Sequence, residues 1–289
     1  MPLPALNVPA LLRQFGLRPD KSLGQNFLVD EGALARVAAA AELAADDAVL
    51  EVGAGLGSLT RHLALSARHV VAVELDDALV AALEQVLRPY PNVEIVHGDI
   101  LALQPGALGL PPGYKVVANI PYYITSLVIR HLLEADVRPA RLALTVQREV
   151  AERICARPPD MSLLAVSVQF YSVPRVAARI PAGAFYPRPS VDSAVVRLDV
   201  LPRRAVDVRD SEAFFRVVKA GFSQKRKQLR NALSGGPQLG GDEADAWLRR
   251  AGIDPRRRAE TLTLDEWGAL SETLPAQARL WVPDDEAAA

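Results

Sequence analysis

Apolar, β-branched runs alternate with helical patterns between about residues 30 and 150, and this alternation limits the possible folds more than any other feature of the chain. Five runs predict strands, at residues 48–53, 69–75, 93–98, 115–120 and 141–147. Helical patterns precede or separate them, at residues 31–45, 57–67, 77–88 and 125–135. Such alternation is typical of βαβ units, whose helices cover both faces of a parallel sheet. We therefore expect an α/β fold with a doubly wound, mainly parallel sheet.

The pattern changes after about residue 160. Residues 163–180 and 193–201 predict two further strands, separated by a proline-rich loop. From about residue 205 the periodicity is helical, and Thr263 with Glu266 three residues later predicts the capping box of a last helix. The domains expected from these changes are a large α/β domain at 1–204, a smaller all-helical domain at 205–280 and a tail at 281–289.

Composition excludes several classes of protein. A chain of 289 residues with 50% hydrophobic residues is long enough to bury a core, and its single Cys155 forms no internal disulfide. The four histidines show no zinc-binding spacing, so we expect no metal site. No run of about 18 apolar residues predicts a membrane span, and the first 20 residues lack the features of a secretory signal. We therefore expect a cytoplasmic protein with no membrane partner.

A glycine-rich loop follows the first predicted strand and opens a helix. Gly53, Gly55 and Gly57 permit positive φ and a close approach of a ligand to the backbone. Ser58 occupies the third position of the dinucleotide fingerprint, which disfavours a nicotinamide-dependent dehydrogenase. With Glu51 before it, the loop is similar to that of S-adenosylmethionine methyltransferases. A tight turn that binds no ligand is the alternative.

Carboxylates follow the next two predicted strands. Glu74 ends the second strand, where a carboxylate can accept hydrogen bonds from both hydroxyls of a ribose. Asp99 follows the third strand, where it can accept a hydrogen bond from the exocyclic amine of an adenine. Because the carboxyl ends of parallel strands meet at one edge of the sheet, we expect both carboxylates to lie in the same crevice as the glycine loop.

The fourth predicted strand ends in the sequence Asn119, Ile120, Pro121 and Tyr122, which we interpret as a catalytic turn. If the Asn119 side-chain carbonyl and the Ile120 backbone carbonyl accept the two hydrogens of an adenine N6 amine, the nitrogen lone pair is directed at a methyl donor. Pro121 stiffens the turn, and Tyr122 offers a ring on which the base can stack. Phe185, in the proline-rich loop between the last two predicted strands, is the candidate for an opposite aromatic wall, although it is also a candidate for core packing.

Taken together, the motifs resemble those of the ribosomal RNA adenine dimethyltransferases, most closely the bacterial small-subunit branch. The resemblance covers about residues 15–275 and is carried by Lys21–Leu28, Glu51–Thr60, Asn119–Tyr122, Phe185–Ser193 and Phe222–Leu233. It implies that S-adenosylmethionine is the methyl donor and that two adjacent adenosines in the 3′-terminal hairpin loop of small-subunit (16S) rRNA each receive two methyl groups on N6. Ile120 departs from the leucine that is more usual in that branch, so this motif does not exclude the sister family that modifies large-subunit rRNA and confers antibiotic resistance.

The resemblance also assigns residues to the cofactor. Those expected to contact S-adenosylmethionine are Gln25, Asn26, Leu28, Gly53, Gly55, Glu74, Asp99 and Asn119. From the residues alone, the segment that contains Gln25, Asn26 and Leu28 is a polar, glycine-containing loop before a helix.

The net charge of −1 conceals a basic segment. Between Arg216 and Arg230 lie six basic residues and no acidic residue, and we interpret this segment as a basic helix that contacts RNA phosphates. The expected contacts are Lys225, Arg226, Lys227 and Arg230. The expected partner is small-subunit rRNA within the immature 30S subunit, bound by a monomer. A protein that acts mainly as a ribosome-assembly factor, with methylation secondary, is compatible with the same residues.

Overall fold

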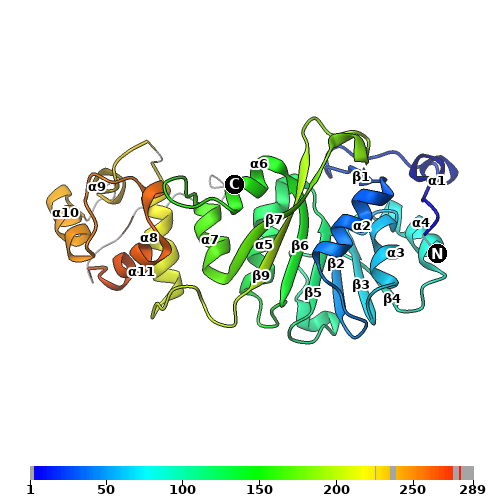
Figure 1. Ribbon diagram of the computed structural model, residues 1–289, viewed down its shortest axis with the longest axis horizontal. Helices are drawn as coiled ribbons and strands as arrows, with labels where there is room; N and C mark the ends of the chain where they lie inside the picture. The colour runs from blue at the N-terminus through cyan, green and yellow to red at the C-terminus, as the bar shows by residue number, and fades with distance from the viewer. Residues whose placement is uncertain (1–2, 225, 235–238, 276–279, 281–289) are drawn as a thin grey trace. The chain divides into compact units, whose positions relative to one another are not determined.

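The computed structural model describes residues 3–224, 226–234, 239–275 and 280 (Figure 1). The chain divides into two compact units. The first takes in the described residues of Met1–Ala151 and Val173–Val200, and the second those of Glu152–Ser172 and Leu201–Ala289. The second unit thus includes residues 152–172, which the sequence pattern placed in the α/β domain.

The first unit is built around a mainly parallel sheet of seven described strands in the order β4-β3-β2-β5-β6-β9-β7. The strands are β2 (Ala48–Val52), β3 (His69–Glu74), β4 (Val93–His97), β5 (Lys115–Asn119), β6 (Arg141–Gln147), β7 (Ser172–Ile180) and β9 (Ser193–Val200). β4, β3, β2, β5 and β6 are parallel neighbours, and β9 pairs with β6 in the antiparallel direction. The five predicted parallel strands and the doubly wound α/β fold are confirmed.

Helices cover the sheet, as expected for a buried parallel sheet. The helices of this unit are α1 (Val8–Gln14), α2 (Glu31–Ala40), α3 (Ser58–Ala64), α4 (Asp77–Leu87) and α5 (Thr125–Glu134), and α6 (Arg148–Ile154) follows β6. Leu34 of α2 and Leu63 of α3 pack against Val49 and Val70 on one face of the sheet. From β2 the chain moves through β3 to β4 at one edge of the sheet, but from β5 it moves through α5 to β6, toward the opposite edge. A right-handed connection therefore places α5 on the face of the sheet opposite α2 and α3.

The strand order reverses at β2, which has β3 on one side and β5 on the other. In doubly wound sheets this switch point opens a crevice at the carboxyl ends of the strands. The N-terminal segment reaches this edge through β1 (Phe27–Leu28), which pairs with β8 (Phe185–Tyr186). Phe27 packs with Leu56 and with Leu79 of α4, so the segment is fixed against the glycine loop.

The strand predicted at 163–180 is wrong over its first half. Residues 163–171 form helix α7 (Leu163–Tyr171), whose N-cap Ser162 accepts a hydrogen bond from the Ala165 backbone N–H, and only β7 is extended. A short, continuously apolar run suits a buried strand or a buried helix equally well, and periodicity does not distinguish them. Here Ala165, Val166 and Phe170 are buried in the core of the second unit.

The second unit is helical in its described residues outside loops. Its helices after the sheet are α8 (Ser211–Phe222), α9 (Leu229–Leu233), α10 (Gly241–Arg250) and α11 (Leu264–Glu272). They pack around Trp247, Trp267 and Phe214, and the predicted capping box of Thr263 and Glu266 is confirmed. The expected continuous basic helix is wrong, because α8 ends at Phe222 and α9 begins at Leu229. The expected tail, 281–289, lies outside the described residues.

Candidate functional site

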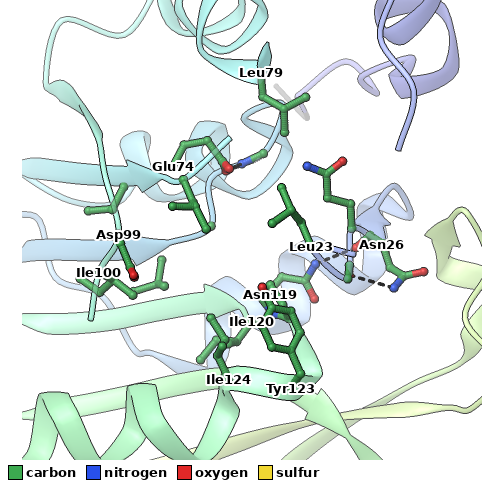
Figure 2. Close-up of a pocket in the computed structure, with 18 of the residues that line it drawn as sticks. Leu23, Asn26, Glu74, Leu79, Asp99, Ile100, Asn119, Ile120, Tyr123 and Ile124 are labelled. Atoms are coloured by element: carbon green, nitrogen blue, oxygen red, sulfur yellow. Dashed lines mark hydrogen bonds between the residues drawn. The ribbon is translucent and has the colours of Figure 1, made fainter. Parts of the chain in front are cut away.

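A cavity that opens to solvent lies at the carboxyl ends of β2, β3, β4 and β5, with about 820 Å³ of empty space including its solvent-exposed mouth. It brings together most residues that the sequence assigned to the cofactor and to the catalytic turn. Those that line it are Gln25, Asn26, Gly53, Gly55, Glu74, Asp99, Asn119, Ile120 and Pro121. Figure 2 shows Glu74 and Asp99 across the cavity from Asn26 and Asn119.

The glycine loop brings its backbone to the cavity wall. Gly53 and Gly55 have φ of 74° and 58°, a region that side chains with a Cβ rarely adopt. A Cβ on Gly55 would lie 3.2 Å from the Phe27 ring, a tight contact that adds to the conformational preference for glycine there. The loop therefore forms a cradle against which a ligand can lie in contact with main-chain atoms.

The Glu74 carboxylate is held at the end of β3 by two backbone donors. Its Oε2 accepts a hydrogen bond from the Gly55 N–H at 2.6 Å, and its Oε1 accepts one from the Asp76 N–H at 2.9 Å. Burial raises the pKa of this carboxyl, while the two backbone hydrogen bonds oppose the increase. A carboxylate has about four acceptor positions, so two remain for the hydroxyls of a ribose.

Asp99 is exposed at the end of the neighbouring strand. Its Oδ1 accepts a hydrogen bond from the Leu101 N–H at 2.9 Å, which fixes the side chain and leaves Oδ2 as an acceptor for an amine. Glu74 and Asp99 thus present acceptors spaced along one wall, which suits the hydroxyls and the exocyclic amine of an adenosine.

The Asn119 amide has a defined orientation at the end of β5. Its Nδ2 donates a hydrogen bond to the Asn26 backbone carbonyl at 2.9 Å, marked by a dashed line in Figure 2. Because the donor arm is used in this way, Oδ1 is the arm that can accept a hydrogen from a target amine. Ile120 and Pro121 continue the wall, and Ile120 is buried.

The aromatic residues differ from expectation. Phe185 is 4% exposed and packs in the core with Leu28 and Leu34, because β8 pairs with β1. The core-packing alternative therefore holds for Phe185, and the expected aromatic wall of the cavity does not. Leu28 likewise is buried and lines a smaller neighbouring cavity of about 310 Å³ instead of the main one. The side chain of Tyr122 lies outside the described residues. Tyr123, which the sequence analysis did not select, lines the main cavity and is 55% exposed.

Sequence reasoning also missed the apolar part of the wall. Leu75 follows Glu74 directly, Ile100 follows Asp99, and Leu79 lies one turn into α4. An apolar residue next to a carboxylate at a strand end was the available signal, since a planar base needs apolar surfaces on its faces as well as acceptors at its edge.

Glu51 is the buried acid of the glycine loop. It is 1% exposed, lines the smaller cavity, and its Oε2 has no hydrogen-bond partner among the described residues. Burial raises its pKa to about 8, with repulsion from Glu74 as a further cause. Glu51 is therefore protonated at neutral pH.

The expected RNA-contact residues lie in the second unit and differ in their exposure and in their ion pairs. Arg226 and Lys227 are exposed in the turn between α8 and α9. Arg230 lies within 3.4 Å of Asp245 and 3.5 Å of Asp242, so α10 supplies acidic partners that the local sequence does not contain. Lys225 lies outside the described residues.

The described part of the chain contains neither a candidate metal-binding cluster nor a candidate membrane-spanning helix. No group of three or more His, Cys, Asp or Glu side chains there could hold a metal ion. No described helix is long and apolar enough to span a membrane.

Comparisons with solved structures place the fold among methyltransferases. The 23S rRNA methyltransferase ErmE matches with a TM-score of 0.68 and 30% identity, covering 86% of this chain and 99% of that chain. A dimethyladenosine transferase from Plasmodium falciparum matches with a TM-score of 0.69 and 23% identity, covering 83% and 94%, and this likeness concerns the fold alone.

Similarity in sequence is higher and extends over nearly the full length. The ribosomal RNA small subunit methyltransferase A of Dehalococcoides mccartyi is 47% identical, with 93% of this chain and 95% of the relative covered. The protein of the same name from Moorella thermoacetica is 48% identical, with 92% and 96% covered. The sequence pattern of the ribosomal RNA adenine dimethylase family matches residues 16–275. The chain therefore belongs to the ribosomal RNA adenine dimethylase family.

Proposed function

We propose that the protein transfers methyl groups from S-adenosylmethionine to N6 of adenines in small-subunit rRNA and forms N6,N6-dimethyladenosine. The observation that supports this proposal most is the orientation of the Asn119 amide. Its donor arm is used by the Asn26 carbonyl, so its acceptor arm is available to an amine at the point where the cofactor and target would meet.

The cavity suits the proposed cofactor in its hydrogen-bonding groups. S-adenosylmethionine supplies, when bound, an electrophilic methyl group on a sulfonium centre. Glu74 would accept hydrogen bonds from its ribose hydroxyls, and Asp99 would accept one from its adenine amine. The Gly53 and Gly55 backbone would lie against its methionine part, where a Cβ on Gly55 would meet Phe27.

The chain's own catalytic contribution would be orientation of the target amine. Oδ1 of Asn119 and the backbone carbonyl of Ile120 would accept the two amine hydrogens, so that the nitrogen lone pair faces the methyl group. No side chain needs to remove a proton before attack. A base in a duplex cannot reach this position, so the target must be unpaired or flipped out. The exposed Tyr123 ring then offers a stacking surface, which is worth about 1–3 kcal/mol per base.

The small-subunit specificity is supported by the two relatives at 47% and 48% identity, whose names state that substrate. Arg226 and Lys227 are the exposed described members of the proposed RNA-contact set. RNA binding through only a few phosphate contacts is consistent with the chain's net charge of −1.

Transfer of labelled methyl groups to undermodified small subunits, to large subunits and to free rRNA, measured in parallel, tests the proposal. We expect label in small-subunit rRNA, recovered after nuclease digestion as N6,N6-dimethyladenosine. Label confined to large-subunit rRNA would assign the protein to the other branch. A lack of transfer to all three substrates, in a preparation that binds S-adenosylmethionine, would refute the proposed reaction.

A further inference from the structure

Residues 20–28 form a strap that lines one side of the cavity. The strap is folded on itself, because the Gln25 N–H donates to the Asp20 carbonyl at 3.1 Å and the Gly24 N–H donates to the Lys21 carbonyl at 3.1 Å. Its last residues are those of β1, which is paired with β8. Residues 23–27 line the cavity, so the position of the strap decides the shape of that wall.

The Gln25 side chain fastens the strap to the turn between β3 and α4. Its Nε2 donates a hydrogen bond to Oδ2 of Asp76 at 2.6 Å, and its Oε1 accepts one from the Asp20 N–H at 2.8 Å. Both arms of the amide therefore have partners inside the protein. A hydrogen bond to a carboxylate is stronger than one between neutral groups. The geometry favours a latch over the cofactor contact that the family resemblance implied.

Asp76 is a rigid anchor for this latch. Its Oδ1 accepts a hydrogen bond from the Ala78 N–H at 3.0 Å and so caps α4, and its own N–H donates to Glu74 at 2.9 Å. Gln25 is therefore joined, through one residue, to the carboxylate proposed to hold the cofactor ribose.

The residue that follows Gln25 in the strap contacts Asn119 at the end of β5. The Asn26 carbonyl accepts the hydrogen bond from Nδ2 of Asn119, and only one peptide unit separates it from the latch. If the strap shifts, this carbonyl moves away and the Asn119 amide is free to rotate. A rotated amide presents its NH₂ group to the target amine, and two donors then face each other.

We propose that Gln25 is a positioning residue, whose hydrogen bond to Asp76 holds the strap so that the Asn26 carbonyl orients the Asn119 amide for the target amine. The inference rests on the proposed function, since it assigns Gln25 a part in the same reaction. It predicts that the latch affects the rate of methyl transfer through Asn119, with little effect on overall stability.

A polarity swap tests the latch. Gln25→Glu places two carboxylates opposite each other. Asp76→Asn keeps the cap on α4 through Oδ1 but turns its NH₂ group toward that of Gln25. In the double variant the hydrogen bond can form in the reverse direction, because the new amide at position 76 donates to the new carboxylate at position 25. That carboxylate can still accept from the Asp20 N–H. Gln14→Glu, exposed at the end of α1, is the matched control for the charge.

Two readouts are compared, the single-turnover methyl-transfer rate with saturating donor and RNA, and hydrogen exchange of the backbone amides of residues 20–28. We expect each single variant to slow transfer about tenfold and to speed exchange in the strap. The double variant should recover both to within about threefold of the wild type. In an Asn119→Ala background, Gln25→Glu should slow transfer no further, since the latch acts through Asn119.

A double variant as slow as the single variants, or an undiminished effect of Gln25→Glu in the Asn119→Ala background, would overturn the inference. The second result would identify Gln25 as a direct contact of cofactor or substrate. If the wild type transfers no methyl group, the proposed function fails instead. Hydrogen exchange of residues 20–28 in the Gln25 and Asp76 variants then shows by itself whether the latch holds the strap.

Discussion

Replacing Glu51 by Gln tests how the buried acid of the glycine loop affects stability. Glu51 is 1% exposed, and burial raises its pKa from 4.5 to about 8. Between these two pH values the folded chain keeps a proton that the unfolded chain has lost. The free energy of unfolding must therefore fall as pH rises through this window, by up to about 1.4 kcal/mol per pH unit from this one group. A glutamine at the same position does not titrate and removes this slope.

From pH 5.5 to pH 7.5, the wild type should lose about 2 to 3 kcal/mol more unfolding free energy than Glu51→Gln. Because Trp247 and Trp267 belong to the second unit, their fluorescence would report on unfolding of that unit and not of the first unit, which contains Glu51. Urea unfolding followed by pulsed hydrogen exchange of the peptide that contains β2 reports on the first unit. Glu84→Gln, which removes an exposed carboxylate from α4, is the control for charge. Equal pH slopes for the wild type and Glu51→Gln would refute the reasoning.

Two other predictions concern the cradle and the basic turn. Gly55→Ala adds a Cβ 3.2 Å from the Phe27 ring at a φ of 58°, and should weaken S-adenosylmethionine binding at least tenfold by calorimetry. The control is Gly109→Ala, at a φ of 69° with no atom within 4 Å of its Cβ. An equal loss of S-adenosylmethionine affinity in both variants would show that the Gly55 backbone is not a specific part of the binding site. Reversing Arg226 and Lys227 to Glu should weaken rRNA binding at least fivefold and reduce its salt dependence, with S-adenosylmethionine affinity unchanged. Reversing the exposed Arg68 and Arg88 should have little effect, and equal weakening by both pairs would show a nonspecific charge effect.

The sequence predicted the sheet well because each strand was a short apolar run bounded by turns. All five parallel strands begin at the expected residue and end within one residue of the expected end. The strand ends followed from this, so Glu74, Asp99 and Asn119 could be placed in one crevice before the structure was known. The prediction for the segment 163–171 failed because a short, mostly apolar run has no period that distinguishes a strand from a helix.

Contacts between distant segments could not be predicted from local pattern. Nothing near Arg230 in the sequence indicates the acidic residues of α10, and nothing near Phe185 indicates that β1 would pair with β8 and bury it. The hydrogen bond from Asn119 to Asn26 joins residues 93 positions apart. The sequence suggested Asn119 as a candidate acceptor for the amine, but the cause of its orientation required the structure.

The most direct test of the catalytic account is the single-turnover rate of Asn119→Ala with saturating S-adenosylmethionine and undermodified small subunits. We predict a rate at least 100-fold below that of the wild type, as for other lost preorganising polar groups. The dissociation constant for S-adenosylmethionine should stay within about threefold of the wild type, because Glu74, Asp99 and the glycine loop remain. A near-normal rate of transfer in this variant would show that the Asn119 amide does not orient the target amine.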